Sequence, residues 1–213
     1  MNTQTVLRAG LLTAALSLVS AGAIAQVGNN QKLLNPNLAS ESELAALPNV
    51  SAELANQIVA GRPFLSGDDL HTLVAAELSE AQLEELYGAM FLPLNLNTAS
   101  RAVIMRVGGM SRKMAHEFEE YRPYTSIEQF RREMGKYVDD AEVARLEQYV
   151  FVPMNLNESS DDHFKTIPGM SRKMVHEFEE YQPYADMGEF RREIGKYVDE
   201  AEVARLERYV TLD

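Results

Sequence analysis

Leu94-Asn95-Leu96-Asn97-Thr98-Ala99-Ser100 is the stretch that decides how this chain is organised, because its pattern occurs three times. It stands 60 residues earlier as Leu34-Asn35-Pro36-Asn37-Leu38-Ala39-Ser40, and 60 residues later as Met154-Asn155-Leu156-Asn157-Glu158-Ser159-Ser160. Residues 91–150 match residues 151–210 at 38 of 60 positions without a gap. Self-similarity at a fixed period indicates tandem structural units.

This period divides most of the chain into three predicted domains, which we call the first, second and third repeats. Their bounds are 34–93, 94–153 and 154–213. The first repeat has diverged, since residues 31–90 match residues 91–150 at only 12 positions. The repeats are joined without a Gly/Ser-rich spacer, so we expect them to dock as a semi-rigid rod or arc.

The N-terminus has the layout of an export signal. Arg8 precedes an uncharged run that ends in Ala23-Ile24-Ala25, a small-residue cleavage site. The run is shorter than the roughly 20 apolar residues of a spanning helix. We therefore predict a secretory signal peptide (1–25) cleaved after Ala25, a linker (26–33), a periplasmic location and no membrane span after cleavage. An uncleaved anchor is the alternative.

The composition excludes several kinds of chemistry. The 213 residues include no cysteine, which excludes disulfides, thiolate catalysis and iron–sulfur clusters. An apolar fraction of 46% is typical of a globular protein. The formal net charge of −12 makes binding to nucleic acid costly.

Apolar residues recur at intervals of three and four, which predicts helices. Gly169 permits a tight left-handed turn, and Ser171 is placed to begin the next helix. Ser126 and Gln129 have the spacing of a capping box, which predicts a third helix. We therefore expect an all-α fold with about four to five short helices in each repeat.

Three motifs carry a resemblance to a known family. They are Asn95-Leu96-Asn97-Thr98-Ala99-Ser100, the hairpin Ile167-Pro168-Gly169-Met170-Ser171-Arg172-Lys173, and Arg122-Pro123-Tyr124 with Ser126-Ile127. Their order and spacing resemble the paired helix-hairpin-helix domain of ComEA-type competence proteins. The resemblance covers the chain after residue 25 and implies three tandem helix-hairpin-helix domains. It also implies sequence-independent binding of double-stranded DNA, although the same domain shape occurs in proteins without DNA, such as an extrinsic subunit of photosystem II.

In DNA-binding members of that family, a Pro-Gly-apolar-Gly hairpin presents backbone amides to a phosphate. Here the second glycine is serine in every repeat. A serine N-cap accepts a hydrogen bond from an amide that a phosphate would otherwise use, although its hydroxyl is also able to donate to phosphate. On the DNA-binding interpretation, the candidate phosphate contacts are Gly109, Ser111, Arg112, Lys113, Gly169, Ser171, Arg172 and Lys173.

The charge of each repeat favours a different ligand. The first repeat has a net charge of −8, the second 0 and the third −6. Only the second repeat is suited to approach a polyanion, and its arginines are also placed to pair with nearby glutamates on a solvated surface.

No catalytic motif is present. His116 and Glu120, like His176 and Glu180, stand four residues apart, but the second histidine of a zinc-binding H-E-x-x-H helix is absent. A charged exposed helix face is the simpler interpretation of both pairs. We therefore expect a protein that is not an enzyme and that holds no cofactor and no metal.

Two main hypotheses follow. The leading one is a protein-interaction or scaffold role in the periplasm of a Gram-negative-type cell, with the acidic first repeat and the closing helices as contact surfaces. The alternative is sequence-independent binding of double-stranded DNA through the hairpin amides. A metal-assisted hydrolase that uses His116 and His176 is a third class.

Overall fold

The computed structural model describes residues 27–28 and 33–212. The predicted signal peptide, its cleavage site after Ala25 and most of the predicted linker lie outside these residues. The described part is mostly helical, which agrees with the predicted fold class at that level. Within it, no helix combines the length and the apolar character needed to cross a bilayer.

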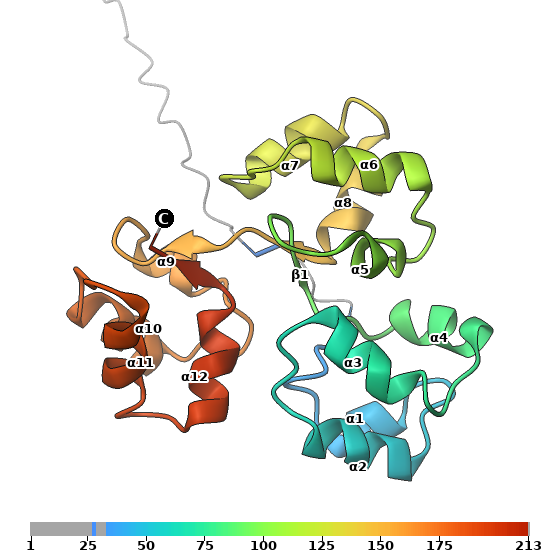
Figure 1. The fold of residues 1–213 in the computed structure, drawn as a ribbon, viewed down its shortest axis with the longest axis horizontal. Coiled ribbons are helices and arrows are strands. Elements are labelled where there is room, and N and C mark those ends of the chain that lie inside the picture. The colour runs from blue at the N-terminus through green and yellow to red at the C-terminus, as the bar shows by residue number, and fades with distance from the viewer. Residues whose placement is uncertain (1–26, 29–32, 213) are drawn as a thin grey trace, which may run out of the picture.

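The helices fall into three groups of four, one for each repeat (Figure 1). The first group is α1 (Glu41–Ala45), α2 (Ala52–Ala60), α3 (Gly67–Val74) and α4 (Glu80–Tyr87). The second group is α5 (Arg101–Met105), α6 (Arg112–Glu120), α7 (Ile127–Met134) and α8 (Asp140–Glu147). The third group is α9 (Asp161–Phe164), α10 (Arg172–Glu180), α11 (Met187–Ile194) and α12 (Glu200–Glu207).

Short parallel strands close the repeats, which is a feature that the all-α prediction missed. The strands are β1 (Leu94–Asn95), β2 (Val150–Phe151), β3 (Met154–Asn155) and β4 (Val210–Thr211). β1 pairs with β2 and β3 with β4, and in the first repeat Leu34 forms a bridge with Met90. Each pairing joins the beginning of a repeat to its end.

The helix starts follow from their capping residues. The hydroxyls of Ser51, Ser111 and Ser171 accept hydrogen bonds from the amides three residues on, at 3.0, 3.1 and 3.1 Å, as their sequence position predicts. Ser126 caps α7 in the same way, but the side chain of Gln129 accepts from the amide of Thr125 rather than from that of Ser126. The predicted capping box is therefore shifted by one residue at its second bond.

The turn before α2, α6 and α10 has left-handed backbone at one position in each repeat. Gly109 has a φ of 72° and Gly169 a φ of 76°, as glycine permits. Asn49 takes the same conformation in the first repeat, with a φ of 63°. Asparagine tolerates this region better than most residues, so the turn survives without its glycine.

The core is shared between repeats. One apolar cluster runs through the first and second repeats without a break, and a second cluster fills the third repeat together with Val27 and Phe151. Phe91 and Tyr149 join the first two repeats with ring centres 4.9 Å apart.

The three groups of helices surround a common centre, unlike the rod or arc that we expected (Figure 1). The third repeat folds back on the first, because Arg208 donates to the carbonyl of Leu65. Leu38 of the first repeat also lies against Gly169 of the third. Extended chain joints alone do not reveal such contacts.

Candidate functional site at the hairpin turns

The structure places the predicted phosphate contacts at two equivalent helix starts. Gly109, Ser111, Arg112 and Lys113 lead into α6, and Gly169, Ser171, Arg172 and Lys173 lead into α10. The serine hydroxyls are engaged by the amides of Met114 and Met174. One amide of each helix start is therefore already satisfied within the chain.

A side chain from the fourth helix reaches each turn, and sequence reasoning missed it. The position is Glu85 in the first repeat, Arg145 in the second and Arg205 in the third. Glu85 accepts from Asn49 Nδ2 at 2.8 Å, and Arg205 Nη1 donates to the carbonyl of Pro168 at 2.6 Å. The guanidinium of Arg145 lies beside Gly109, 3.6 Å from where a Cβ would stand. The 60-residue register of these three positions is the signal that identifies them.

The two glycine turns differ in their neighbours. A methyl group of Leu38 lies 2.9 Å from the position that a Cβ at Gly169 would take. At Gly108, in the turn of the second repeat, no atom lies within 4 Å of that position. The turn of the second repeat is therefore the more accessible of the two.

The lysines next to these turns lean on tyrosine rings. Lys113 Nζ lies 5.6 Å from the ring centre of Tyr137, and Lys173 Nζ lies 4.9 Å from that of Tyr197. A cation over an aromatic face is attracted by the ring's electrons. Hydrogen bonding to Tyr121 raises the pKa of Tyr137 above its ordinary value, so this ring carries no charge near neutral pH. The lysine charges remain exposed beside the helix starts.

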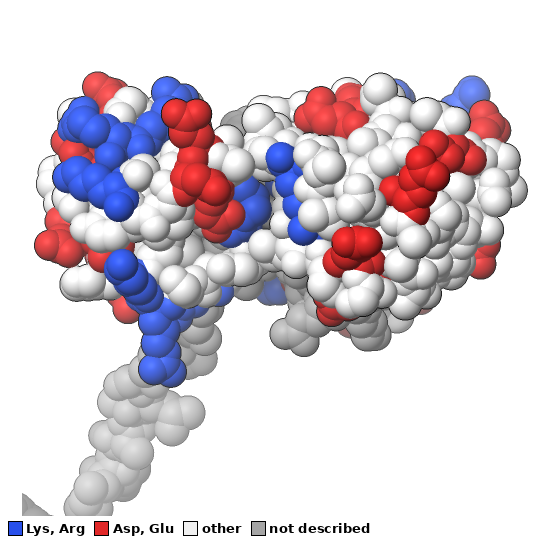
Figure 2. Space-filling view, turned by 90° about the horizontal axis from the view of Figure 1, so that it is seen from below, with Lys and Arg blue, Asp and Glu red and all other residues white. Residues whose placement is uncertain are grey.

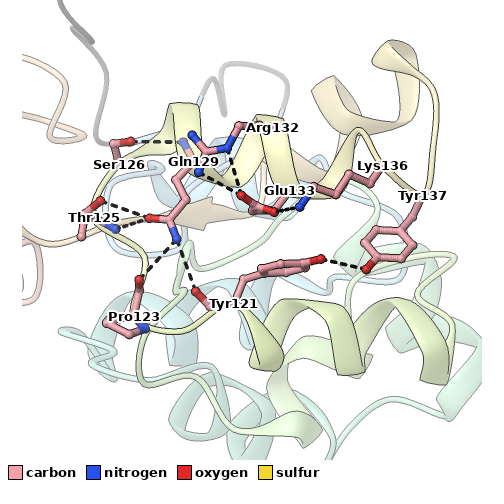
Figure 3. A network of polar contacts seen from close by, with 9 residues as sticks. All are labelled: Tyr121, Pro123, Thr125, Ser126, Gln129, Arg132, Glu133, Lys136 and Tyr137. Carbon is pink, nitrogen blue, oxygen red and sulfur yellow. Dashed lines mark hydrogen bonds and ion pairs between the residues drawn. The ribbon is translucent and has the colours of Figure 1, made fainter.

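Most other cations of the second repeat have carboxylate partners. Arg131 makes a two-bond pair with Glu147, with both distances 2.7 Å. Glu133 holds both Arg132 and Lys136, and these side chains are drawn with the Tyr121–Tyr137 bond in Figure 3. In the part of the chain that the structure describes, Arg112 makes no ion pair. The predicted solvated ion-pair surface is thus the main arrangement, with an unpaired cation at the turn.

The histidines predicted as weak metal ligands form ordinary pairs along one helix. His116 Nε2 lies 3.1 Å from a carboxylate oxygen of Glu120, and His176 Nε2 lies 3.4 Å from Glu180. Their side chains are well exposed. Among residues 27–28 and 33–212, no cluster of three or more such ligands is present.

A groove runs between α4 and the turn that joins α5 to α6, with a volume of about 490 Å³. Its apolar surface is provided by Leu83, Met105, Val107 and Met110. Met105 is 38% exposed, which is unusual for a side chain of that size.

The polar rim of this groove is mainly acidic. Glu80 and Glu84 line it from α4, and Arg106 is held by Asp68 at 2.7 Å. His71 contacts the hydroxyl of Tyr87 at 2.9 Å. Burial raises the pKa of Tyr87 to about 12 and lowers that of His71, so both are neutral at pH 7.

The surface charge differs between the ends of the molecule. Figure 2 shows lysines and arginines gathered beside acidic side chains at the end formed by the third repeat. The opposite end in the same view, formed by the first repeat, shows separate acidic patches on a neutral surface. This agrees with the single basic residue of the first repeat, Arg62, whose guanidinium is engaged by the carbonyls of Pro36 and Ala39.

Comparison with known proteins finds relatives of a different name from the predicted family. The chain is 29% identical over 165 residues to the endonuclease/exonuclease/phosphatase family domain-containing protein 1 of Bos taurus, covering 57% of this chain and 28% of the relative. The protein of that name from Rattus norvegicus is 29% identical over 163 residues, with the same coverage. That from Xenopus laevis is 30% identical over 132 residues, covering 46% of this chain and 24% of the relative. No family model matches, and no solved structure matches significantly.

These relatives correct two predictions. The assignment to the ComEA-type family is wrong, because the relatives carry another family name. The prediction that the protein is not an enzyme is also wrong on this comparison, because that name refers to endonucleases, exonucleases and phosphatases. The chain spans about a quarter of the length of these relatives.

Proposed function

We propose that this chain is a periplasmic recognition module of three tandem helix-hairpin-helix domains that binds a protein partner. The groove between α4 and the α5–α6 turn is the proposed binding site. The observation that carries the proposal is the combination of exposed apolar surface at Met105 with an acidic rim at Glu80 and Glu84.

The chemistry of the groove selects the partner segment. An apolar side chain from the partner would bury the exposed surface of Met105, which is favourable because apolar area leaves water. A lysine or arginine next to it would meet Glu80 and Glu84. We therefore propose a segment that combines a large apolar residue with a basic one. Charge complementarity of this kind mainly sets specificity and association rate.

A defined pair of peptides tests this proposal. One carries lysine–leucine pairs, and the other has the same length and leucines but carries glutamate in place of lysine. The methyl signals of Met105 and Met110 in an NMR spectrum report occupation of the groove. We expect the lysine peptide to shift both signals and the glutamate peptide to leave them unchanged.

Charge variants sharpen the test. Glu80→Gln with Glu84→Gln should weaken the lysine peptide by up to about tenfold, because each exposed ion pair is worth ~0–1 kcal/mol. Glu53→Gln removes an exposed charge from α2 of the same repeat and should leave the affinity unchanged. Equal binding of both peptides, or equal loss with Glu53→Gln, would contradict the proposal.

A second candidate function is sequence-independent binding of nucleic acid at the turn of the second repeat. Two observations favour it. Arg112 makes no ion pair with any described residue, and the backbone at Gly108 is open. The relatives' name includes endonucleases and exonucleases, enzymes that act on nucleic acid. A mobility-shift assay with duplex DNA at two salt concentrations, scored also for cleavage in the presence of Mg²⁺, tests this function.

A further inference from the structure

A separate cavity lies where the three repeats meet, with a volume of about 330 Å³. The start of α3 and β1 with the loop after it form two of its sides, and Arg208 enters from the third repeat. In Figure 1, α12 and α3 lie side by side below β1 at this centre. The cavity is distinct from the groove beside Met105.

Arg208 is a largely buried cation without a carboxylate partner. Its Nε donates to the carbonyl of Leu65 at 2.7 Å, and its Nη2 donates to that of Pro93 at 2.9 Å. Its Nη1 is shielded from solvent and makes no hydrogen bond within the described residues. The guanidinium also lies 5.6 Å from the ring centre of Phe151. Burial lowers the pKa of Arg208, but arginine stays protonated in proteins, so the charge persists.

The cavity lining does not neutralise this charge. Asp68 is the one carboxylate among the lining residues, and Arg106 already holds it at 2.7 Å. Two cations thus face one carboxylate around the cavity. A buried charge without a partner is costly, so a negative ligand that pairs with it is stabilising.

The rest of the lining suits an oxyanion. Ser66 and Gly67 begin α3, a helix of eight residues whose positive end favours negative charge. Thr98 adds a hydroxyl from the second repeat, and hydroxyls donate readily to phosphate and carboxylate oxygens. Positive charge, a helix start and a hydroxyl donor therefore converge on one space.

We propose that this cavity binds a small oxyanion, a phosphate or carboxylate group, which pairs with Arg208 and fastens the third repeat to the other two. Arg208 comes from one repeat and the remaining polar lining from the other two. Ligand binding and the mutual placement of the repeats are therefore coupled.

The chain itself supplies the variants for a test. The position of Arg208 is Gln148 in the second repeat, and the position of Thr98 is Glu158 in the third. Arg208→Gln and Thr98→Glu therefore introduce residues that the same fold already accepts at the equivalent places. Arg172→Gln removes an exposed cation from the third repeat and serves as the matched control.

The experiment measures the thermal midpoint of the purified protein with inorganic phosphate, citrate or chloride at constant ionic strength. We expect phosphate or citrate to raise the midpoint of the wild type and of Arg172→Gln by roughly 3 °C or more at tenfold excess over Kd. Arg208→Gln should lose this response. A rise with phosphate alone assigns the phosphate class, and a rise with citrate alone assigns the carboxylate class. An equal rise in Arg208→Gln and the wild type, or no rise with either anion, would overturn the proposal.

A second variant covers the case in which Arg208→Gln does not fold. Thr98→Glu places a carboxylate in the cavity, so it should raise the midpoint without added anion and remove the response to phosphate or citrate. Thr98→Gln has the same size without the charge and should keep the response. A full wild-type response in Thr98→Glu would contradict the proposal.

Discussion

At the scale of single residues, the second asparagine of each Asn-x-Asn motif ties together two distant parts of its repeat. The side chain of Asn97 accepts from the amide of Tyr124 at 2.6 Å and donates to its carbonyl at 2.9 Å. Asn37 and Asn157 do the same with Phe64 and Tyr184. The motif recurs because it satisfies backbone groups that would otherwise be buried without partners.

Replacing Asn97 with alanine should therefore be costly. Tyr124 is 2% exposed, so its amide would lose its partner without gaining water. We expect Asn97→Ala to lower the free energy of unfolding by about 2 kcal/mol. Urea denaturation measures this change, and amide exchange at Tyr124 should speed up in parallel. Gln148→Ala, which removes an exposed amide side chain from α8, should change neither; unchanged exchange at Tyr124 in Asn97→Ala would refute the clamp.

The repeat of this motif was evident from the sequence, but its partner was not. Asn97 and Tyr124 are 27 residues apart, and no local pattern connects an asparagine to a backbone at that distance. The same limit applies to Arg145 and Arg205, whose place beside the turns depends on how α8 and α12 pack. Only the 60-residue register relates them.

At the scale of elements, the two equivalent hairpins are no longer equivalent once folded. The turn before α6 is open at Gly108, whereas Leu38 packs against the turn before α10. Their start residues were predictable, because a serine N-cap and a left-handed glycine are local signals. The two-residue strands were not, because each depends on a partner strand at the other end of its repeat.

This difference gives a prediction for nucleic acid binding. If duplex DNA binds, Arg112→Ala with Lys113→Ala should abolish the mobility shift at low salt, because phosphate contacts provide most non-specific affinity. The matched pair Arg172→Ala with Lys173→Ala should weaken the shift less, since Leu38 narrows access to that turn. Equal losses in the two double variants would mean that the hairpins contribute alike, and no shift with the wild type would exclude this function.

At the scale of the whole molecule, the repeats defined by sequence are not the units defined by packing. The first two repeats share one continuous core, and the third has its own. The period of 60 residues reveals the number of repeats but not how they pack, because the joining contacts are made by residues that differ between copies. Arg208, Leu38 and Phe91 are such residues, and their equivalents are of other types or in other surroundings.

Phe91 provides the last prediction. It is 5% exposed and packs edge-on against Tyr87 of the first repeat and Tyr149 of the second, with ring centres 5.9 and 4.9 Å apart. Phe91→Ala should cost about 3–5 kcal/mol, as for other large buried aromatic residues. Since the core is continuous, amide exchange at Leu86 in α4 and Leu146 in α8 should speed up together, while Leu206 in α12 stays protected.

Phe190→Ala is the matched control for this coupling. Phe190 packs against Phe178 and Tyr184 inside the third repeat, so its loss should expose the amide of Leu206 and leave those of Leu86 and Leu146 protected. Native-state hydrogen exchange separates these outcomes because it reports each helix individually. Faster exchange at Leu86 alone in Phe91→Ala would show that the first two repeats unfold independently, in which case their shared core contributes contacts but no cooperativity.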